Sequence, residues 1–336
     1  MSAPALPRAA IVGIAGLVLS PAEAALFAAH PPAGAILFRR NVADPAQLRA
    51  LTDALHAALP PGAPILVDQE GGRVARLRPP HWRAHPPAAT IGVLHARDAV
   101  AGLRAAWLTG ALIGLDCASA GIDVACAPVL DLRLPITHDA IGDRAFSADP
   151  EAVAALGRAM AEGLLAAGVQ PVGKHAPGHG RAAVDSHLAL PLVQDTDLSA
   201  DLVPFARNAD LPWMLTSHIL YPALDPERPA TLSPAIIGGV IRGRIGFAGV
   251  LASDDLAMQA LTGTPAERAT AALTAGCDIA LYCPGDLAGT EAVLCACPPL
   301  TEAAGGRLAA ARALAAARRV PLDGDALAHE RDGLLA

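Results

Sequence analysis

Short apolar runs rich in β-branched residues alternate along this chain with longer stretches in which alanine, leucine and arginine recur at helical spacing. The short runs are typical of buried strands, and the longer stretches are typical of helices. Several helical stretches begin with Asp-Pro or Thr-Pro and end at glycine, as helices commonly do. The predicted strands are residues 9–16, 34–38, 64–68, 122–130, 169–175, 213–218, 249–255 and 278–283, and the clearest helices are residues 44–59, 97–120, 149–168 and 264–276.

Eight strands separated by helices predict a single (β/α)8 barrel of the TIM type, with residues 1–336 forming one domain. A doubly wound open sheet is the alternative, but no GxGxxG follows the first strand. Polar residues stand where five of the predicted strands end. They are Asp68, Asp131, Lys174–His175, Ser217–His218 and Asp254–Asp255. Because barrels place their active sites at the C-terminal strand ends, and charge buried elsewhere is costly, this pattern predicts an enzyme.

The N-terminal segment, MSAPALPRAAIVGIAGLVLSPAEAALFAA, permits two interpretations. Arg8 followed by an apolar stretch and small residues is typical of a secretory signal peptide. The run AAIVGIAG is equally typical of a buried strand, and we favour the strand because the barrel needs it for closure. No apolar segment reaches the length of a membrane span without charges or helix breakers.

Composition and charge exclude several classes of partner. The net charge is −7 and no basic run occurs, which argues against nucleic acid binding. The six cysteines form no CxxC pair and mostly lie in apolar runs, as expected of free thiols in a reduced, intracellular compartment. Cys295-Ala-Cys297 is a possible metal-binding pair.

The segment KHAPGHGRAAVDSHLALP, residues 174–191, contains three histidines and the only lysine of the chain, Lys174. The other 24 of the 25 basic residues are arginine. One interpretation of this segment is a metal site, with His175, His179, His187 and Asp185 as ligands. Against it, the first strand offers no ligand, and no compact ligand set elsewhere completes the site.

The second interpretation is acid/base chemistry on a mobile loop. Asp185 stands two residues before His187, close enough in a turn for the carboxylate to fix the tautomer of the imidazole and to stabilise its charged form. A turn with a capping aspartate is the structural alternative. Gly178 and Gly180 permit backbone conformations that other residues resist, and loops that close over substrate often complete a site.

An acid/base of this kind requires a nucleophile. Ser217 is a candidate, but no GxSxG elbow surrounds it. Asp254 is the better one, because it follows an apolar strand and should be held rigidly at the barrel mouth. A carboxylate nucleophile with a separate proton donor is the equipment of a retaining glycosidase, and here the donor would be a histidine.

Motifs along nearly the whole chain resemble glycoside hydrolase family 3, and specifically the single-domain bacterial β-N-acetylglucosaminidases of peptidoglycan recycling. They are GAILFRRN (34–41), VDQEGGRVARL (67–77), APVLD (127–131), IGDRAF (141–146), KHAPGHG with VDSH (174–187), SHILYP (217–222) and SDDLAM (253–258). They occur in the family's order, and their joint occurrence is much more specific than any one of them. The resemblance implies a barrel, a cytoplasmic location and no metal or cofactor.

The resemblance also implies a role for individual residues. Asp254 matches the nucleophile, His187 the acid/base and Asp185 its partner. The residues that match those binding the terminal N-acetylglucosamine are Asp68, Arg76, Arg144, Lys174 and His175. Asp255 is interpreted as a loop or supporting group. Ala176 departs from the pattern, since these enzymes usually carry an aromatic residue after Lys-His.

These observations predict a retaining exo-β-N-acetylglucosaminidase that acts on muropeptides, works as a cytoplasmic monomer and binds neither membrane nor nucleic acid. A phosphorylase that uses the same covalent intermediate is the alternative, because a histidine base does not repel phosphate as a carboxylate would. A metal-dependent barrel hydrolase and a non-catalytic sugar-binding barrel are further alternatives. The lone lysine is explained if a compact ammonium fits among sugar hydroxyls where the wider guanidinium would not.

Overall fold

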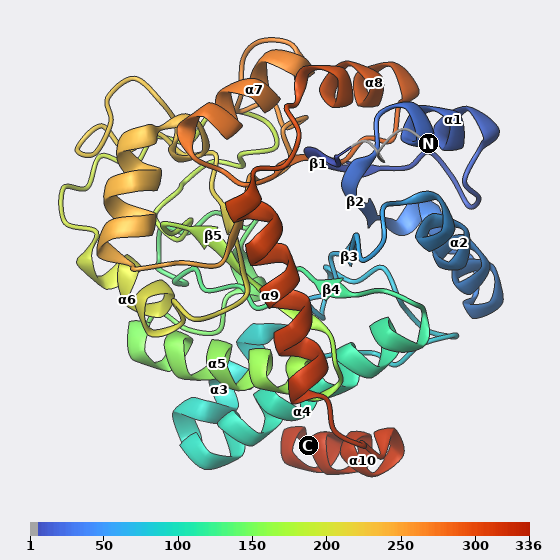
Figure 1. Cartoon of the computed structure of the whole chain (residues 1–336). Coiled ribbons are helices and arrows are strands. Elements are labelled where there is room, and N and C mark those ends of the chain that lie inside the picture. Colours follow the sequence, from blue (N-terminus) through green and yellow to red (C-terminus); the bar gives the residue numbers. More distant parts are fainter. Residues whose placement is uncertain (1–5) are drawn as a thin grey trace.

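Eight parallel strands form a nearly closed barrel in the computed structural model, which describes residues 6–336 (Figure 1). The sheet has the order β7-β6-β5-β4-β3-β2-β1-β8, and a parallel bridge between Ala252 and Ile279 links β7 to the chain just before β8. The predicted (β/α)8 barrel is therefore confirmed. The strands are β1 Arg8–Gly13, β2 Pro32–Leu37, β3 Ile65–Val67, β4 Val124–Ala125, β5 Gln170–Ala176, β6 Trp213–Thr216, β7 Val250–Ala252 and β8 Ala280–Tyr282.

Helices follow the strands and surround the barrel (Figure 1). Many begin at a capping side chain. Asp44, Asp149 and Thr264, for example, each accept a backbone amide of the first turn, and proline follows each of them. The helices are α1 Pro21–Ala29, α2 Pro45–Ala58, α3 Ala88–Arg97, α4 Ala99–Ser119, α5 Pro150–Ala166, α6 Ser199–Arg207, the π-helix η4 Ala235–Arg244, α7 Pro265–Ala275, α8 Leu287–Ala296, α9 Glu302–Arg318 and α10 Gly324–Leu335.

Successive residues of the strands point alternately into and out of the barrel. In β1, Ile11 packs in the inner cluster, whereas Ala10 and Val12 pack in the larger outer cluster against the helices. In β8, Leu281 packs in the inner cluster and Tyr282 in the outer one. This alternation builds the two concentric cores of a barrel and leaves the strand ends free to carry polar groups.

Helix α9 covers the N-terminal end of the barrel (Figure 1). Ala311 of α9 packs in the inner cluster, and Arg307 pairs with Asp278 at 2.6 Å just before β8. The residues on either side of α9 are also tied down, since the Leu300 amide donates to Pro7 and the Val320 amide to Ala166. The opposite, C-terminal end is therefore the one available for a site.

The apolar N-terminal run and helix α4 are both part of the packed fold. Strand β1 pairs with β2 on one side and with β8 on the other. Helix α4 is long and apolar enough to cross a membrane by length and composition, but 67% of its apolar window is buried inside the molecule, where it packs against α3, α5 and α10.

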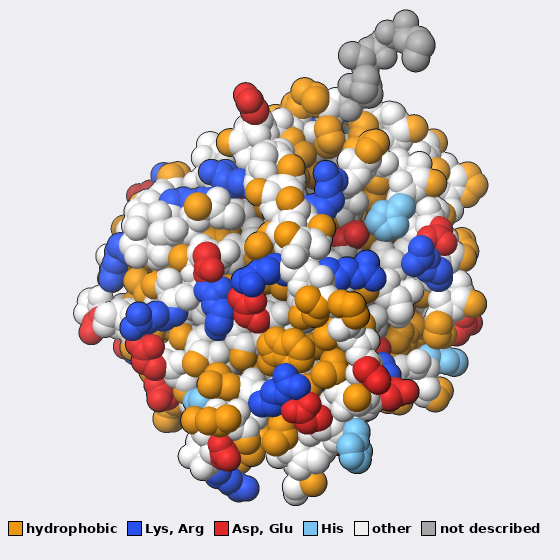
Figure 2. Space-filling model, turned by 60° about the horizontal axis from the view of Figure 1, so that its bottom comes forward, with side chains coloured by type: hydrophobic (Ala, Val, Ile, Leu, Met, Phe, Trp, Pro, Cys, Tyr) orange, Lys and Arg blue, Asp and Glu red, His pale blue; other side chains and the backbone are white. Residues whose placement is uncertain are grey.

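Basic and acidic side chains are interspersed on the face shown in Figure 2.

One predicted strand is much shorter than expected. The run at 122–130 forms only the two residues of β4. Pro128 has no amide hydrogen to donate, and the Ala127 amide donates locally to Ala125. Contact with β5 continues beyond β4, since the Val172 amide donates to the Ala127 oxygen and Val129 bridges to Lys174.

Candidate active site

A pocket opens at the C-terminal end of the barrel, opposite α9. It is lined by residues at the ends of several strands, among them Phe38 after β2, Asp68 after β3, Cys126 after β4 and Cys283 after β8. The structure places seven of the eight site residues predicted from the sequence in this lining, namely Asp68, Arg76, Arg144, Lys174, His175, His187 and Asp254. The eighth, Asp185, contacts His187.

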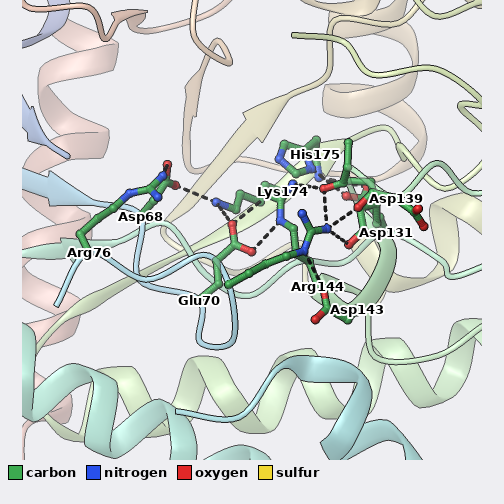
Figure 3. Close-up of polar contacts among 12 residues, drawn as sticks. Asp68, Glu70, Arg76, Asp131, Asp139, Asp143, Arg144, Lys174 and His175 are labelled. Carbon is green, nitrogen blue, oxygen red and sulfur yellow. Dashed lines mark hydrogen bonds and ion pairs between the residues drawn. The ribbon is translucent and has the colours of Figure 1, made fainter. Parts of the chain in front are cut away.

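A network of charged side chains forms one wall of the pocket (Figure 3). Lys174 and Glu70 are buried in it, and Asp68, Arg76 and Arg144 are half-buried. Lys174 Nζ lies 2.9 Å from Asp68 Oδ1 and 2.5 Å from Glu70 Oε1, and its side chain is 2% exposed. Arg144 donates to both oxygens of Glu70, at 2.8 and 2.9 Å. Arg76 donates to Asp68 Oδ2 at 3.1 Å. Because each carboxylate meets two cations, the wall is rigid and fully ionised.

The pKa values of these groups follow from their mutual contacts. Burial alone would raise the pKa of both carboxyls, but Lys174 and Arg76 hold the pKa of Asp68 well below its usual value. Arg144 and Lys174 likewise lower the pKa of Glu70 to about 2. Burial opposes the charge of Lys174, but Asp68 and Glu70 outweigh it and raise the pKa of the lysine.

His175 is held by Asp131 beneath the pocket. Its Nδ1 lies 2.7 Å from Asp131 Oδ2, and its backbone amide donates to Oδ1 of the same carboxylate. Asp131 is fully buried, and its Oδ1 also accepts the amide of His179 at 2.7 Å. The carboxylate thus fixes the ring of His175 with Nε2 free to face the pocket.

Asp254 lies two residues beyond the end of β7, after the fully buried Ser253. Its Oδ1 accepts the amide of Asp255 at 2.8 Å. Burial would raise the pKa of Asp254, but the imidazoles of His175 and His218 and the Asp255 amide outweigh burial and lower it. The side chain is therefore a fixed carboxylate at neutral pH, which is the state that a carboxylate nucleophile requires.

Asp255 has a different environment from its neighbour. Its Oδ1 accepts the amides of Ala257 and Cys283, so the side chain ties the loop after β7 to the end of β8. Burial raises the pKa of Asp255. Its backbone oxygen accepts a hydrogen bond from Nε2 of His218. Burial lowers the pKa of the His218 imidazole. These contacts agree with the interpretation of Asp255 as a supporting group.

Asp185 and His187 contact each other on the loop after β5. Nδ1 of His187 lies 2.8 Å from Asp185 Oδ1, and the His187 amide donates to the same oxygen at 2.9 Å. Burial opposes ionisation of Asp185, but the two hydrogen bonds from His187 lower its pKa. The carboxylate therefore orients the imidazole as in a catalytic dyad, although this geometry also contains the aspartate-capped turn that is the structural alternative.

The structure does not support the alternative nucleophile or a metal site. Ser217 is fully buried with its hydroxyl 3.4 Å from Tyr221 Oη, and it is not part of the lining. Within residues 6–336, no group of three or more His, Cys, Asp or Glu side chains is arranged to hold a metal ion. Ala176 is fully buried at the end of β5, opposite Thr216.

The sequence pattern did not identify Glu70, although it contacts both Lys174 and Arg144. Glu70 lies within the VDQEGGRVARL motif, three residues beyond the end of β3. One sequence signal does point to Glu70: it is an acidic residue that stands between Asp68 and Arg76 in the same motif. The position of Asp131 at a strand end is visible in the sequence, but its contact with His175 is not.

A barrel with a fixed carboxylate, a His–Asp pair on a loop and a wall of charged side chains around one pocket is the construction of a carbohydrate-processing hydrolase. Residues 16–320 match the Glycosyl hydrolase family 3 N terminal domain. The chain belongs to glycosyl hydrolase family 3 and is a glycoside hydrolase.

The chain is similar to several proteins in this family over most of its length. A Beta-hexosaminidase of Alkalilimnicola ehrlichii is 44% identical over 280 residues, which cover 81% of this chain and 80% of that protein. A Beta-hexosaminidase of Chromobacterium violaceum is 43% identical over 291 residues, covering 83% and 79%. The crystal structure of NagZ from Neisseria gonorrhoeae in complex with N-trifluoroacetyl-D-glucosamine superposes with a TM-score of 0.87 at 33% identity, covering 99% of this chain and 100% of that one.

Proposed function

We propose that this chain is a retaining exo-β-N-acetylglucosaminidase, which removes N-acetylglucosamine from the non-reducing end of its substrate. The observation that carries the proposal is the convergence of Asp254, His187 and the Lys174 network on one pocket. That pocket combines a fixed carboxylate, a separate proton donor and charged groups suited to sugar hydroxyls. The names of the relatives and the N-acyl-glucosamine analogue bound by NagZ support N-acetylhexosamine as the sugar.

The reaction proceeds in two steps through a covalent intermediate. In the first, Asp254 attacks the anomeric carbon while protonated His187 donates its proton to the leaving oxygen. In the second, His187 removes a proton from water, and the resulting hydroxide releases the sugar from Asp254. Asp185 stabilises the charged form of the imidazole in both steps.

The sugar is held by the residues that surround Asp254. Asp68 accepts hydrogen bonds from sugar hydroxyls, and the cationic groups and His175 donate to them. Because the charged side chains are already paired with one another, they do not reorganise when the sugar binds. The residues with this role are Asp68, Arg76, Arg144, Lys174 and His175.

We further propose that the substrates are muropeptides that carry a non-reducing N-acetylglucosamine, and that the enzyme serves cell-wall recycling as a cytoplasmic monomer without metal or cofactor. The six cysteines are free, and five of them are buried. Such thiols are compatible with a reducing compartment.

Kinetics with chromogenic glycosides test the proposal directly. The N-acetylglucosaminide should be cleaved and the corresponding glucoside should not. Asp254→Asn should abolish turnover and leave no covalent sugar, whereas His187→Ala should accumulate a glycosyl-Asp254 species that mass spectrometry detects. Azide should then restore turnover of His187→Ala, because it attacks without a base. Wild-type behaviour of His187→Ala on natural and activated substrates alike would contradict the mechanism.

A phosphorylase that uses the same intermediate is the second candidate. The observation that favours it is the histidine in the acid/base position, which carries no negative charge to repel phosphate. Product analysis with and without inorganic phosphate separates the two activities, since a phosphorylase releases N-acetylglucosamine 1-phosphate. A metal-dependent hydrolase would instead lose its activity when a chelator is added.

A further inference from the structure

The loop segment that carries Asp185 and His187 has one buried side chain, and the His187 backbone oxygen also accepts the Gln259 amide at 3.4 Å. Between Ala183 and Leu190, Ser186 is the one buried residue, and its neighbours are half-buried or exposed. The side chain of His187 is 65% exposed. Packing therefore does little to fix the imidazole of His187. Its direction depends on the contact with Asp185 and on what holds Ser186, which lies between the two residues.

His179 provides that contact. Its Nε2 lies 3.2 Å from Ser186 Oγ, and the whole residue is 3% exposed. Its backbone amide donates to Asp131, and its ring packs edge-on against the ring of His175 with centroids 5.7 Å apart. Asp131 and His175 belong to the rigid floor of the pocket, so His179 joins that floor to the loop.

The polar contacts of the His179 ring single out Ser186. Within residues 6–336, the buried Nδ1 of His179 has no hydrogen-bond partner, and the one polar contact of the ring is the hydroxyl of Ser186. Burial lowers the pKa of His179 to about 4, although Asp131 opposes this effect. The ring is therefore neutral under working conditions.

We propose that His179 is a positioning residue for the acid/base: it holds the hydroxyl of Ser186 and thereby directs His187 into the pocket. Ser186 lies between Asp185 and His187 in sequence, so fixing its side chain fixes the backbone of both members of the pair. The lining of the pocket includes His179, Ser186 and His187 together. This inference rests on the proposed role of His187 as acid/base.

The test compares two substrates whose leaving groups differ in their need for a proton. A nitrophenyl N-acetylglucosaminide has a good leaving group, whereas N,N′-diacetylchitobiose must expel a sugar hydroxyl. General acid/base assistance raises the rate by about 10²- to 10⁴-fold, and a misoriented His187 should lose part of this contribution. Ser186→Ala should therefore lower kcat/KM on diacetylchitobiose by roughly 10- to 100-fold, and on the nitrophenyl substrate by less than about threefold.

Three further variants complete the design. His179→Leu should reproduce the selective loss, and His179→Gln should restore part of the activity because its amide can reach Ser186. Leu188→Ala is the matched control, since Leu188 is 69% exposed on the same loop and should leave both rates unchanged. Thermal unfolding is measured for each variant. Ser186→Ala removes a single oxygen atom, so it keeps the test valid if His179→Leu unfolds.

The outcomes separate this inference from the proposed function. Equal losses on both substrates after Ser186→Ala, or no loss on either, would overturn the positioning role. His187→Ala is measured in parallel. If His187→Ala discriminates between the substrates and Ser186→Ala does not, only the positioning role fails. If His187→Ala itself does not discriminate, the proposed acid/base is wrong.

Discussion

Replacement of Glu70 by glutamine tests whether the charge network stabilises the barrel. Glutamine is close to isosteric with a protonated glutamate, so Glu70→Gln removes the charge that Lys174 and Arg144 share and keeps the shape of the side chain. A pKa lowered from 4.5 to about 2 corresponds to roughly 3 kcal/mol in favour of the ionised form in the folded protein. We therefore expect Glu70→Gln to lower the free energy of unfolding by about 3 kcal/mol at pH 7.

The dependence of this effect on pH follows from the sign of the pKa change. Because the pKa of Glu70 is lower in the folded state, the unfolded chain takes up the proton first as the pH falls. The stabilisation is present above about pH 4.5 and is lost toward pH 2. The difference between wild type and Glu70→Gln should therefore shrink to roughly half at pH 3.

Urea unfolding followed by circular dichroism, at several pH values between 7 and 3, measures both effects. Glu151→Gln is the matched control, because Glu151 forms an ion pair with Arg207 in which the side chains are 61% and 67% exposed. Such a surface pair is worth less than about 1 kcal/mol. If Glu70→Gln proves as stable as the control at pH 7, or if its deficit is the same at pH 3 as at pH 7, the charge of Glu70 does not hold the network.

Three other experiments have expected outcomes. Lys174→Arg should raise KM for the N-acetylglucosaminide about tenfold or more, equivalent to roughly 1.4 kcal/mol, because a guanidinium is too wide for the slot between Asp68 and Glu70; an unchanged KM would contradict this. Gly13→Ala should lower the free energy of unfolding by about 1–3 kcal/mol, since an added Cβ would lie 2.2 Å from the backbone oxygen of Cys283, whereas Gly16→Ala meets no atom within 4 Å and should be neutral. Intact-mass analysis of the natively produced protein should find β1 retained, and a mature chain that starts after β1 would show that the segment is a signal peptide.

The barrel could be predicted because its strands and helices are encoded locally. Each strand is an apolar run of its own, and helices such as α2, α5 and α7 begin within one residue of the position given by their Asp-Pro or Thr-Pro start. The rule that C-terminal strand ends carry the site then placed Asp68, Lys174 and Asp254 on one rim. Strand β4 was overestimated because apolar composition does not report whether an amide such as that of Ala127 donates to a neighbouring strand or locally.

The remaining features depend on contacts between distant parts of the chain. Lys174 and Asp68 are 106 residues apart, and Arg144 and Glu70 are 74 residues apart. No local pattern specifies that Glu70 points toward Lys174 and not toward solvent. In the same way, no local pattern specifies that α9 covers the N-terminal end of the barrel.

The geometry of Glu70 extends the explanation for the single lysine. Arg144 occupies both oxygens of Glu70 with two nearly equal hydrogen bonds, which is the arrangement that a planar guanidinium prefers. A second guanidinium at position 174 would need another carboxylate with both oxygens available. Arg144 already occupies both oxygens of Glu70, and Arg76 occupies one oxygen of Asp68. A compact ammonium does not need two oxygens of the same carboxylate, because it can donate to one oxygen of Asp68 and one of Glu70 at the same time. The two carboxylates therefore select lysine at this position before any sugar binds, and the fit to sugar hydroxyls is a second constraint on the same residue.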